Sequence, residues 1–118
     1  MYNILSKIYS QIMENMDIII ATFKALGLPK PIPEYKFHPA RKWKADYAWP
    51  EKRIALEKEG GVYKKGKDGQ RGGRHNRPQG FINDMKKYNA LTEMGWKLFR
   101  YLPNKIDYDQ IIRVYKNA

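Results

Sequence analysis

Hydrophobic periodicity divides the chain into a helical beginning, a strand-rich middle and a C-terminal part that contains both patterns. Apolar side chains near helical spacing predict one amphipathic helix over residues 3–26. Gly27 follows as a helix stop, and the prolines within residues 29–33 prevent continuation. We therefore expect an N-terminal helix within residues 1–28, followed by an extended connector.

From residue 34 onward the apolar positions recur with a period of two, which is typical of half-buried β-strands. This pattern predicts strands over residues 34–38, 43–49 and 53–59. Residues 50–52 (Pro-Glu-Lys) separate the last two segments and favour a tight turn. The second and third strands should therefore form a hairpin.

Helical periodicity returns over residues 80–94 and ends at Gly95. Residues 96–101 then predict a last strand, and residues 107–116 a terminal helix with Asp107 as its N-cap. The element order αβββαβα predicts an α/β fold, in which a mixed β-sheet of about four strands is flanked by helices. A helical crossover precedes the last strand, so it should run parallel to the strand before the crossover.

Length and composition set the domain organisation and the class of partner. With 118 residues, the chain suits a single domain over 1–118, with a core over residues 34–101. Lys and Arg outnumber Asp and Glu by 23 to 12, and the resulting charge of +11 favours a polyanionic partner. Cysteine is absent, which excludes disulfides and thiolate metal sites. No apolar run is long enough for a signal peptide or a membrane span, so we expect a cytoplasmic protein.

The predicted hairpin sorts its side chains onto two faces. If the chain reverses between Glu51 and Lys52, one face is apolar and consists of Ala45, Tyr47, Trp49, Ile54 and Leu56. The opposite face carries Lys44, Asp46, Ala48, Ala55, Glu57 and Glu59. In this register Asp46 lies opposite Glu57.

Carboxylates gathered on that second face are the strongest indication of chemistry. Asp46 and Glu57 across one rung repel each other unless something neutralises them, and Glu59 points the same way two residues along. Three converging carboxylates are a typical way to hold a hard cation such as Mg²⁺. Two alternatives remain: one carboxyl is protonated, or Lys44 pairs with Glu59 and no metal binds. A register slip of one residue would scatter the set.

A second group of candidate residues lies in the Gly-rich, basic segment 60–79, which predicts a loop. Its cations would bind phosphates beside the acidic site. These nucleic-acid-binding candidates are Lys64, Lys65, Arg71, Arg74, His75 and Arg77. His75 is also a candidate proton donor to the leaving group, because histidine titrates near neutral pH. The alternative is a charged, disordered loop without a site.

Several of these motifs together resemble the PD-(D/E)XK nuclease superfamily, and its small phage and prophage endonucleases in particular. The superfamily places an Asp and a Glu on a hairpin, with a Lys two residues after the Glu. Glu59 occupies the Lys position here, as in Glu-X-Glu variants. The residues that carry the resemblance are Phe37-His38-Pro39, Asp46, Glu57-Lys58-Glu59-Gly60-Gly61, Gly73-Arg74-His75, Asp84, Lys87-Tyr88-Asn89 and Gly95-Trp96.

The resemblance implies a restriction-endonuclease-like core and Mg²⁺-dependent hydrolysis of DNA phosphodiester bonds, with Mn²⁺ as a substitute. It implies Asp46, Glu57 and Glu59 as metal ligands, with the carbonyl of Lys58 completing the shell. Lys87 is our first candidate for the missing motif lysine, ahead of Lys58 and Lys44.

DNA, duplex or branched, is the expected partner, and a homodimer is expected if both strands are cut. A phage-encoded chain would act in the cytoplasm of its bacterial host. Two other functions remain open: a non-catalytic basic nucleic-acid-binding module, and a phage interaction protein that needs no metal site.

Overall fold

The computed structural model describes residues 2–60 and 78–118. It divides the chain into two compact units, residues 1–31 and residues 32–118. Within the described ranges, no helix combines the length and the apolar character that crossing a membrane requires.

The first unit contains two helices, α1 (Tyr2–Asn15) and α2 (Ile18–Ala25), so the prediction of one helix over residues 3–26 was wrong. Asp17 causes the break. Its backbone is extended, and its side chain accepts a hydrogen bond of 3.1 Å from the backbone N–H of Ile20, which caps the start of α2. Aspartate competes with helical hydrogen bonding in a helix interior and is favoured at an N-cap. The predicted stop is confirmed, since Gly27 follows α2 with a φ of 93°.

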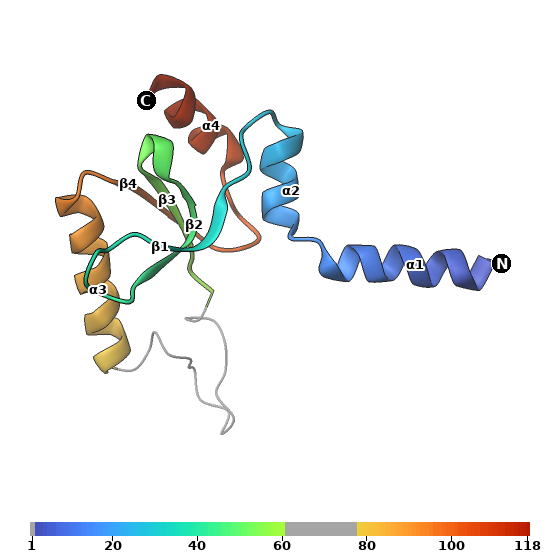
Figure 1. Ribbon diagram of the computed structural model, residues 1–118, viewed down its shortest axis with the longest axis horizontal. Helices are drawn as coiled ribbons and strands as arrows, with labels where there is room; N and C mark the ends of the chain where they lie inside the picture. The colour runs from blue at the N-terminus through green and yellow to red at the C-terminus, as the bar shows by residue number, and fades with distance from the viewer. Residues whose placement is uncertain (1, 61–77) are drawn as a thin grey trace. The chain divides into compact units, whose positions relative to one another are not determined.

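The second unit is built on a four-stranded mixed sheet, which confirms the predicted fold class (Figure 1). Its strands are β1 (Ile32–Lys36), β2 (Lys44–Trp49), β3 (Ile54–Lys58) and β4 (Lys97–Tyr101), in the order β1-β2-β3-β4. The pairs β1–β2 and β2–β3 are antiparallel, and β3–β4 is parallel as predicted. The helices of this unit are α3 (Pro78–Glu93), which forms the crossover between β3 and β4, and α4 (Tyr108–Asn117).

The hairpin of β2 and β3 has the register that the sequence predicted. Tyr47 pairs with Leu56, Ala48 with Ala55, and Trp49 with Ile54. A single 3-10 turn, Pro50–Lys52, joins the strands, and Arg53 follows it in the left-handed conformation with a φ of 50°.

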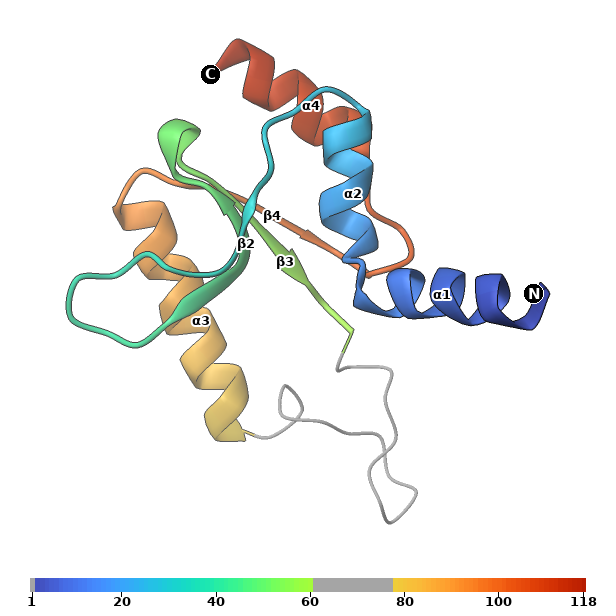
Figure 2. The ribbon, with the colours of Figure 1, turned by 45° about the vertical axis from the view of Figure 1, so that its right-hand side comes forward.

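Helices cover both faces of the sheet, α3 on one side and α4 on the other (Figure 1 and Figure 2). On the α4 side, the ring of Trp49 contacts Tyr115 edge to face. On the α3 side, Ala48 and Ala55 are fully buried in one cluster with Leu91 of α3. Because side chains alternate along a strand, this second face is the one that carries Glu57. The carboxylate-bearing face is therefore interior where it meets α3, and this places Glu57 in a partly apolar environment.

Candidate active site

Regular strand pairing is interrupted on both sides of Asp46. The ladder between β2 and β3 ends at Tyr47 and Leu56. On the other side of β2, the register with β1 passes from Tyr47 to Ala45 without an Asp46 rung. The β1 residue skipped there is Glu34, whose left-handed φ of 51° turns its backbone away from strand geometry. The sheet therefore opens at Asp46.

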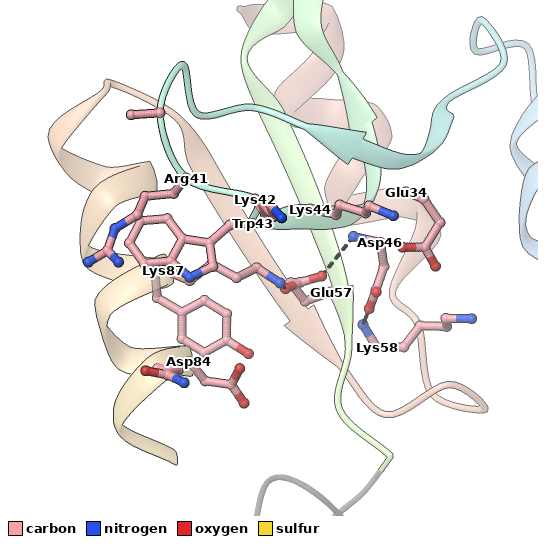
Figure 3. Close-up of a pocket in the computed structure, with 13 residues that line it drawn as sticks. Glu34, Arg41, Lys42, Trp43, Lys44, Asp46, Glu57, Lys58, Asp84 and Lys87 are labelled. Carbon is pink, nitrogen blue, oxygen red and sulfur yellow. Dashed lines mark hydrogen bonds and ion pairs between the residues drawn. The ribbon is translucent and has the colours of Figure 1, made fainter. Parts of the chain in front are cut away.

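Two carboxylates replace the missing ladder acceptors. The backbone N–H of Asp46 donates to Oε2 of Glu57 at 2.8 Å, and the backbone N–H of Lys58 donates to Oδ2 of Asp46 at 2.7 Å (Figure 3). Each strand thus supplies a carboxylate that binds the backbone of the other strand. Hydrogen bonds of this charge-assisted type are short and hold both side chains in defined positions.

Glu57 is a buried acid, with 3% of its surface exposed. Burial, helped by the negative charge of Asp46 and opposed by the ammonium of Lys87, raises the pKa of the Glu57 carboxyl from 4.5 to about 7. The predicted repulsion between Asp46 and Glu57 is therefore present, although desolvation has the larger effect.

Lys87 reaches the same carboxylate from α3. Its ammonium forms an ion pair with Oε1 of Glu57, and both side chains are largely buried. The first sequence candidate for the missing motif lysine is thus placed against one of the two central acids. Lys58 has its ammonium 5.3 Å from the centre of the Tyr47 ring, which fits its expected position on the apolar side of the hairpin.

Asp46, Glu57 and Lys87 line one cavity of about 800 Å³ (Figure 3). Its lining contains five basic and four acidic residues. Arg41, Lys42 and Lys44 are exposed and are called its rim here, and this rim can attract a polyanion, whereas the less exposed acids Asp46, Glu57 and Asp84 are called its floor. The cations are Arg41, Lys42, Lys44, Lys58 and Lys87, and the acids are Glu34, Asp46, Glu57 and Asp84. The remaining lining residues are Ala40, Trp43, Asn83 and Tyr88.

Glu59 does not complete a three-carboxylate group with Asp46 and Glu57, so the predicted convergence of three acids is corrected. Oε1 of Glu59 accepts hydrogen bonds from the hydroxyl of Tyr88 at 2.7 Å and from Nε of Arg100 at 2.8 Å. These donors come from α3 and β4 and direct the carboxylate toward those two elements. Burial and the bond to Glu59 raise the pKa of Tyr88, so its hydroxyl keeps its proton and remains a donor.

We expect Glu59→Ala to lower the free energy of unfolding by about 2 kcal/mol, because the half-buried Tyr88 hydroxyl loses its acceptor. Glu59→Gln retains an acceptor oxygen and should cost about 1 kcal/mol or less. Chemical denaturation of both variants measures the difference. Equal losses would contradict a hydrogen-bonding role for Glu59.

The residues of the chain that the structure describes contain no group of three or more His, Cys, Asp or Glu side chains placed to hold a metal ion. Two of the lining carboxylates nevertheless fit a Mg²⁺ ion, which typically uses one or two protein carboxylates together with waters and substrate phosphates. When both are ionised, Asp46 and Glu57 carry two negative charges against the one positive charge of Lys87. The pair thus retains negative charge for a divalent cation.

The remaining candidates divide into two groups. Lys64, Lys65, Arg71, Arg74, His75 and Arg77 lie outside the described residues. Asp84, on α3, is buried and lines the cavity.

Sequence reasoning missed the contribution of the connection between β1 and β2, although three cations around a tryptophan, Arg41-Lys42-Trp43-Lys44, directly precede Ala45 and Asp46.

Comparisons of the chain with protein-family models, with curated proteins and with solved structures find no match. The resemblance to PD-(D/E)XK nucleases accordingly remains an interpretation of the sequence motifs. Function has to be argued from the chemistry of the site, because a fold class alone does not determine an activity.

Proposed function

We propose that the chain is a metal-dependent endonuclease that hydrolyses DNA phosphodiester bonds in the cavity beside α3. The observation that carries this proposal is the reciprocal pair of Asp46 and Glu57. Two acids are fixed where the strands part, beside a lysine and in a cavity that is also lined by exposed basic residues. The mutual repulsion of the two carboxylates is a cost that a bound cation would relieve.

Asp46 and Glu57 would hold a Mg²⁺ or Mn²⁺ ion. When bound, such an ion lowers the pKa of a coordinated water and stabilises the negative charge that develops on the phosphate. The protein's own contribution is positioning. The backbone N–H groups of Asp46 and Lys58 keep both carboxylates in place, so little reorganisation is needed during the reaction.

Lys87 has two roles in this proposal. Its ammonium partly neutralises Glu57 before metal and substrate arrive, which makes the buried carboxylate tolerable. With substrate in the cavity, the same ammonium is close enough to the acids to stabilise charge on a phosphate oxygen. The rim cations bring the polyanion to an acidic floor that would otherwise repel it.

A non-catalytic nucleic-acid-binding module is the second candidate, and one observation favours it. Asp46 and Glu57 already have backbone and lysine partners without any metal. In that case the acids would stabilise the open hairpin, and the cations alone would bind nucleic acid.

The deciding experiment measures cleavage of linear duplex, nicked duplex, four-way junction and single-stranded DNA with and without Mg²⁺ or Mn²⁺. We expect metal-dependent cleavage that Asp46→Ala reduces by at least about 100-fold, because a ligand to the metal is lost. The matched control is Asp109→Asn, which changes an exposed acid on α4 and should cut like the wild type. DNA binding without cleavage under every metal condition would support the binding module, and undiminished cleavage by Asp46→Ala would reject this site.

A further inference from the structure

The connection between β1 and β2 is an ordered, aromatic-rich segment. Phe37 is buried, and the ring of Trp43 stacks on it with 6.4 Å between centroids and 15° between planes. The imidazole of His38 contacts both rings edge to face, at 6.3 Å from Phe37 and 5.3 Å from Trp43. These contacts anchor the two ends of the connection to the core cluster beneath it.

His38 also fixes the backbone between these anchors. Its Nδ1 accepts hydrogen bonds from the backbone N–H groups of Ala40, at 3.1 Å, and Arg41, at 2.9 Å. Both residues are exposed, so the turn depends on this side-chain acceptor rather than on burial. The backbone position of Arg41 is therefore set by His38.

Arg41 in turn lies over Trp43, with its guanidinium carbon 4.7 Å from the ring centroid. Stacking engages the flat face of a guanidinium, whereas its N–H donors lie at the edge and suit the oxygens of a phosphate. A stacked arginine has already lost much of its rotamer freedom, so binding a phosphate requires little further ordering.

This segment lies on the cavity that holds the carboxylate pair. Arg41, Lys42 and Lys44 all line that cavity, and all three are exposed (Figure 3). Residues 37–45 contain no acid, so the positive charge of this rim is not offset within the segment itself. The carboxylates of Asp46 and Glu57 repel an approaching phosphodiester. The three cations are placed to offset this repulsion and to hold the phosphodiester beside the two acids.

We propose that the β1–β2 connection is a preformed clamp for the DNA backbone. Arg41 is its main phosphate ligand, and His38 and Trp43 are positioning residues that hold Arg41. The clamp rests on the proposed DNA substrate but does not require that the protein cuts DNA.

The test measures binding of a labelled DNA duplex in EDTA, where metal-dependent cleavage cannot occur, over a series of salt concentrations. We expect Arg41→Gln to bind roughly tenfold more weakly at low salt and to reduce the slope of log K against log salt by about 0.9, the value for one lost phosphate contact. The matched control is Lys116→Gln, which removes an exposed cation of α4 outside the cavity and should retain the wild-type slope. If Arg41→Gln and Lys116→Gln have the same affinity and slope, the clamp is rejected.

Positioning by Trp43 and His38 is tested by double-mutant cycles. Trp43→Leu should reproduce most of the affinity loss of Arg41→Gln, and the double variant should lose little more than Arg41→Gln alone. Trp43→Phe keeps a ring and should retain most of the affinity. His38→Asn keeps a side-chain acceptor for the turn and should therefore bind more tightly than His38→Leu, although both variants lose the imidazole contacts with Phe37 and Trp43. Additive losses in the cycle would reject the positioning role.

The same data separate this proposal from the proposed function. A protein that binds DNA through Arg41 but never cleaves it retains the clamp and loses the nuclease assignment. If cleavage depends on Asp46 but Arg41→Gln binds DNA as tightly as the wild type, the nuclease assignment is retained and the clamp is rejected.

Discussion

Replacing Glu57 by glutamine should make the protein more stable at neutral and alkaline pH while abolishing metal-dependent cleavage. The carboxyl is buried and lies beside Asp46, which together raise its pKa to about 7. Glutamine has nearly the same shape and keeps an oxygen that can accept the backbone N–H of Asp46. The substitution therefore removes a desolvated charge without removing the hydrogen bond.

The direction of the pH effect follows from the two pKa values. In the unfolded chain Glu57 ionises near its ordinary value of 4.5, whereas in the folded protein it keeps its proton up to about 7. Between these values the folded state binds more protons, so wild-type stability falls as the pH rises. Above the folded pKa, ionisation of the buried carboxyl lowers the free energy of unfolding by roughly 3 kcal/mol in total. Replacing the carboxyl by an amide should recover part of this loss.

Denaturation curves from about pH 4 to pH 9 test this expectation. Glu57→Gln should remove the decline in stability between about pH 4.5 and pH 7. Above that range its free energy of unfolding should exceed that of the wild type by about 1–3 kcal/mol, and the gain is not larger because Lys87 loses its ion-pair partner at the same time. The control is Glu93→Gln, at the exposed end of α3, whose curve should follow the wild type. A wild-type curve without this decline would contradict a raised Glu57 pKa, and retained cleavage by Glu57→Gln would remove Glu57 from the metal site.

The sequence was sufficient to predict the parts of the fold that depend on local periodicity. The hairpin register followed from the alternation of β2 and β3 around the turn at Pro50, because only one register buries Trp49, Ile54 and Leu56 together. The parallel β4 followed from the helical crossover before it.

Two features of the fold have physical reasons that periodicity does not contain, and the first of them made the prediction of one N-terminal helix wrong. Apolar spacing continues across Asp17, but the aspartate is more stable as a cap than inside a helix, and it divides the predicted segment into α1 and α2. The alanines Ala48 and Ala55 fit either a solvated or a covered face, and only the packing of Leu91 from α3 shows that this face is interior.

In the candidate site, too, the sequence predicted the contacts between neighbouring strands and not those between distant elements. Asp46 and Glu57 are brought together by one hairpin, so the sequence was sufficient to pair them. The partners of Glu59 come from α3 and β4, which lie 29 and 41 residues away along the chain. Contacts over such separations depend on tertiary packing, and no local pattern indicates that these donors turn Glu59 away from a metal position.

Removing the cation of Lys87 should destabilise the protein strongly at high pH and only slightly at low pH. Lys87→Met leaves a buried Glu57 without its ion-pair partner, and breaking a buried pair in this way typically costs about 3–5 kcal/mol. Near pH 5 the carboxyl is protonated in the folded state, so there is little charge for Lys87 to compensate. Without the lysine the pKa of Glu57 should rise further, and the loss of stability should therefore increase as the pH rises through 7 and above.

Lys86 offers a matched control one residue away, because it is an exposed lysine on the same helix. Lys86→Met should change the stability by less than about 0.5 kcal/mol at every pH. The double variant Glu57→Gln/Lys87→Met should lose the pH-dependent part of the defect, because neither buried charge remains. A defect of Lys87→Met that is equal at about pH 5 and pH 9, or that persists in the double variant, would mean that Lys87 stabilises α3 by packing alone. Such a result would also remove the reason for placing its ammonium beside the phosphate, since that placement depends on the same ion pair with Glu57.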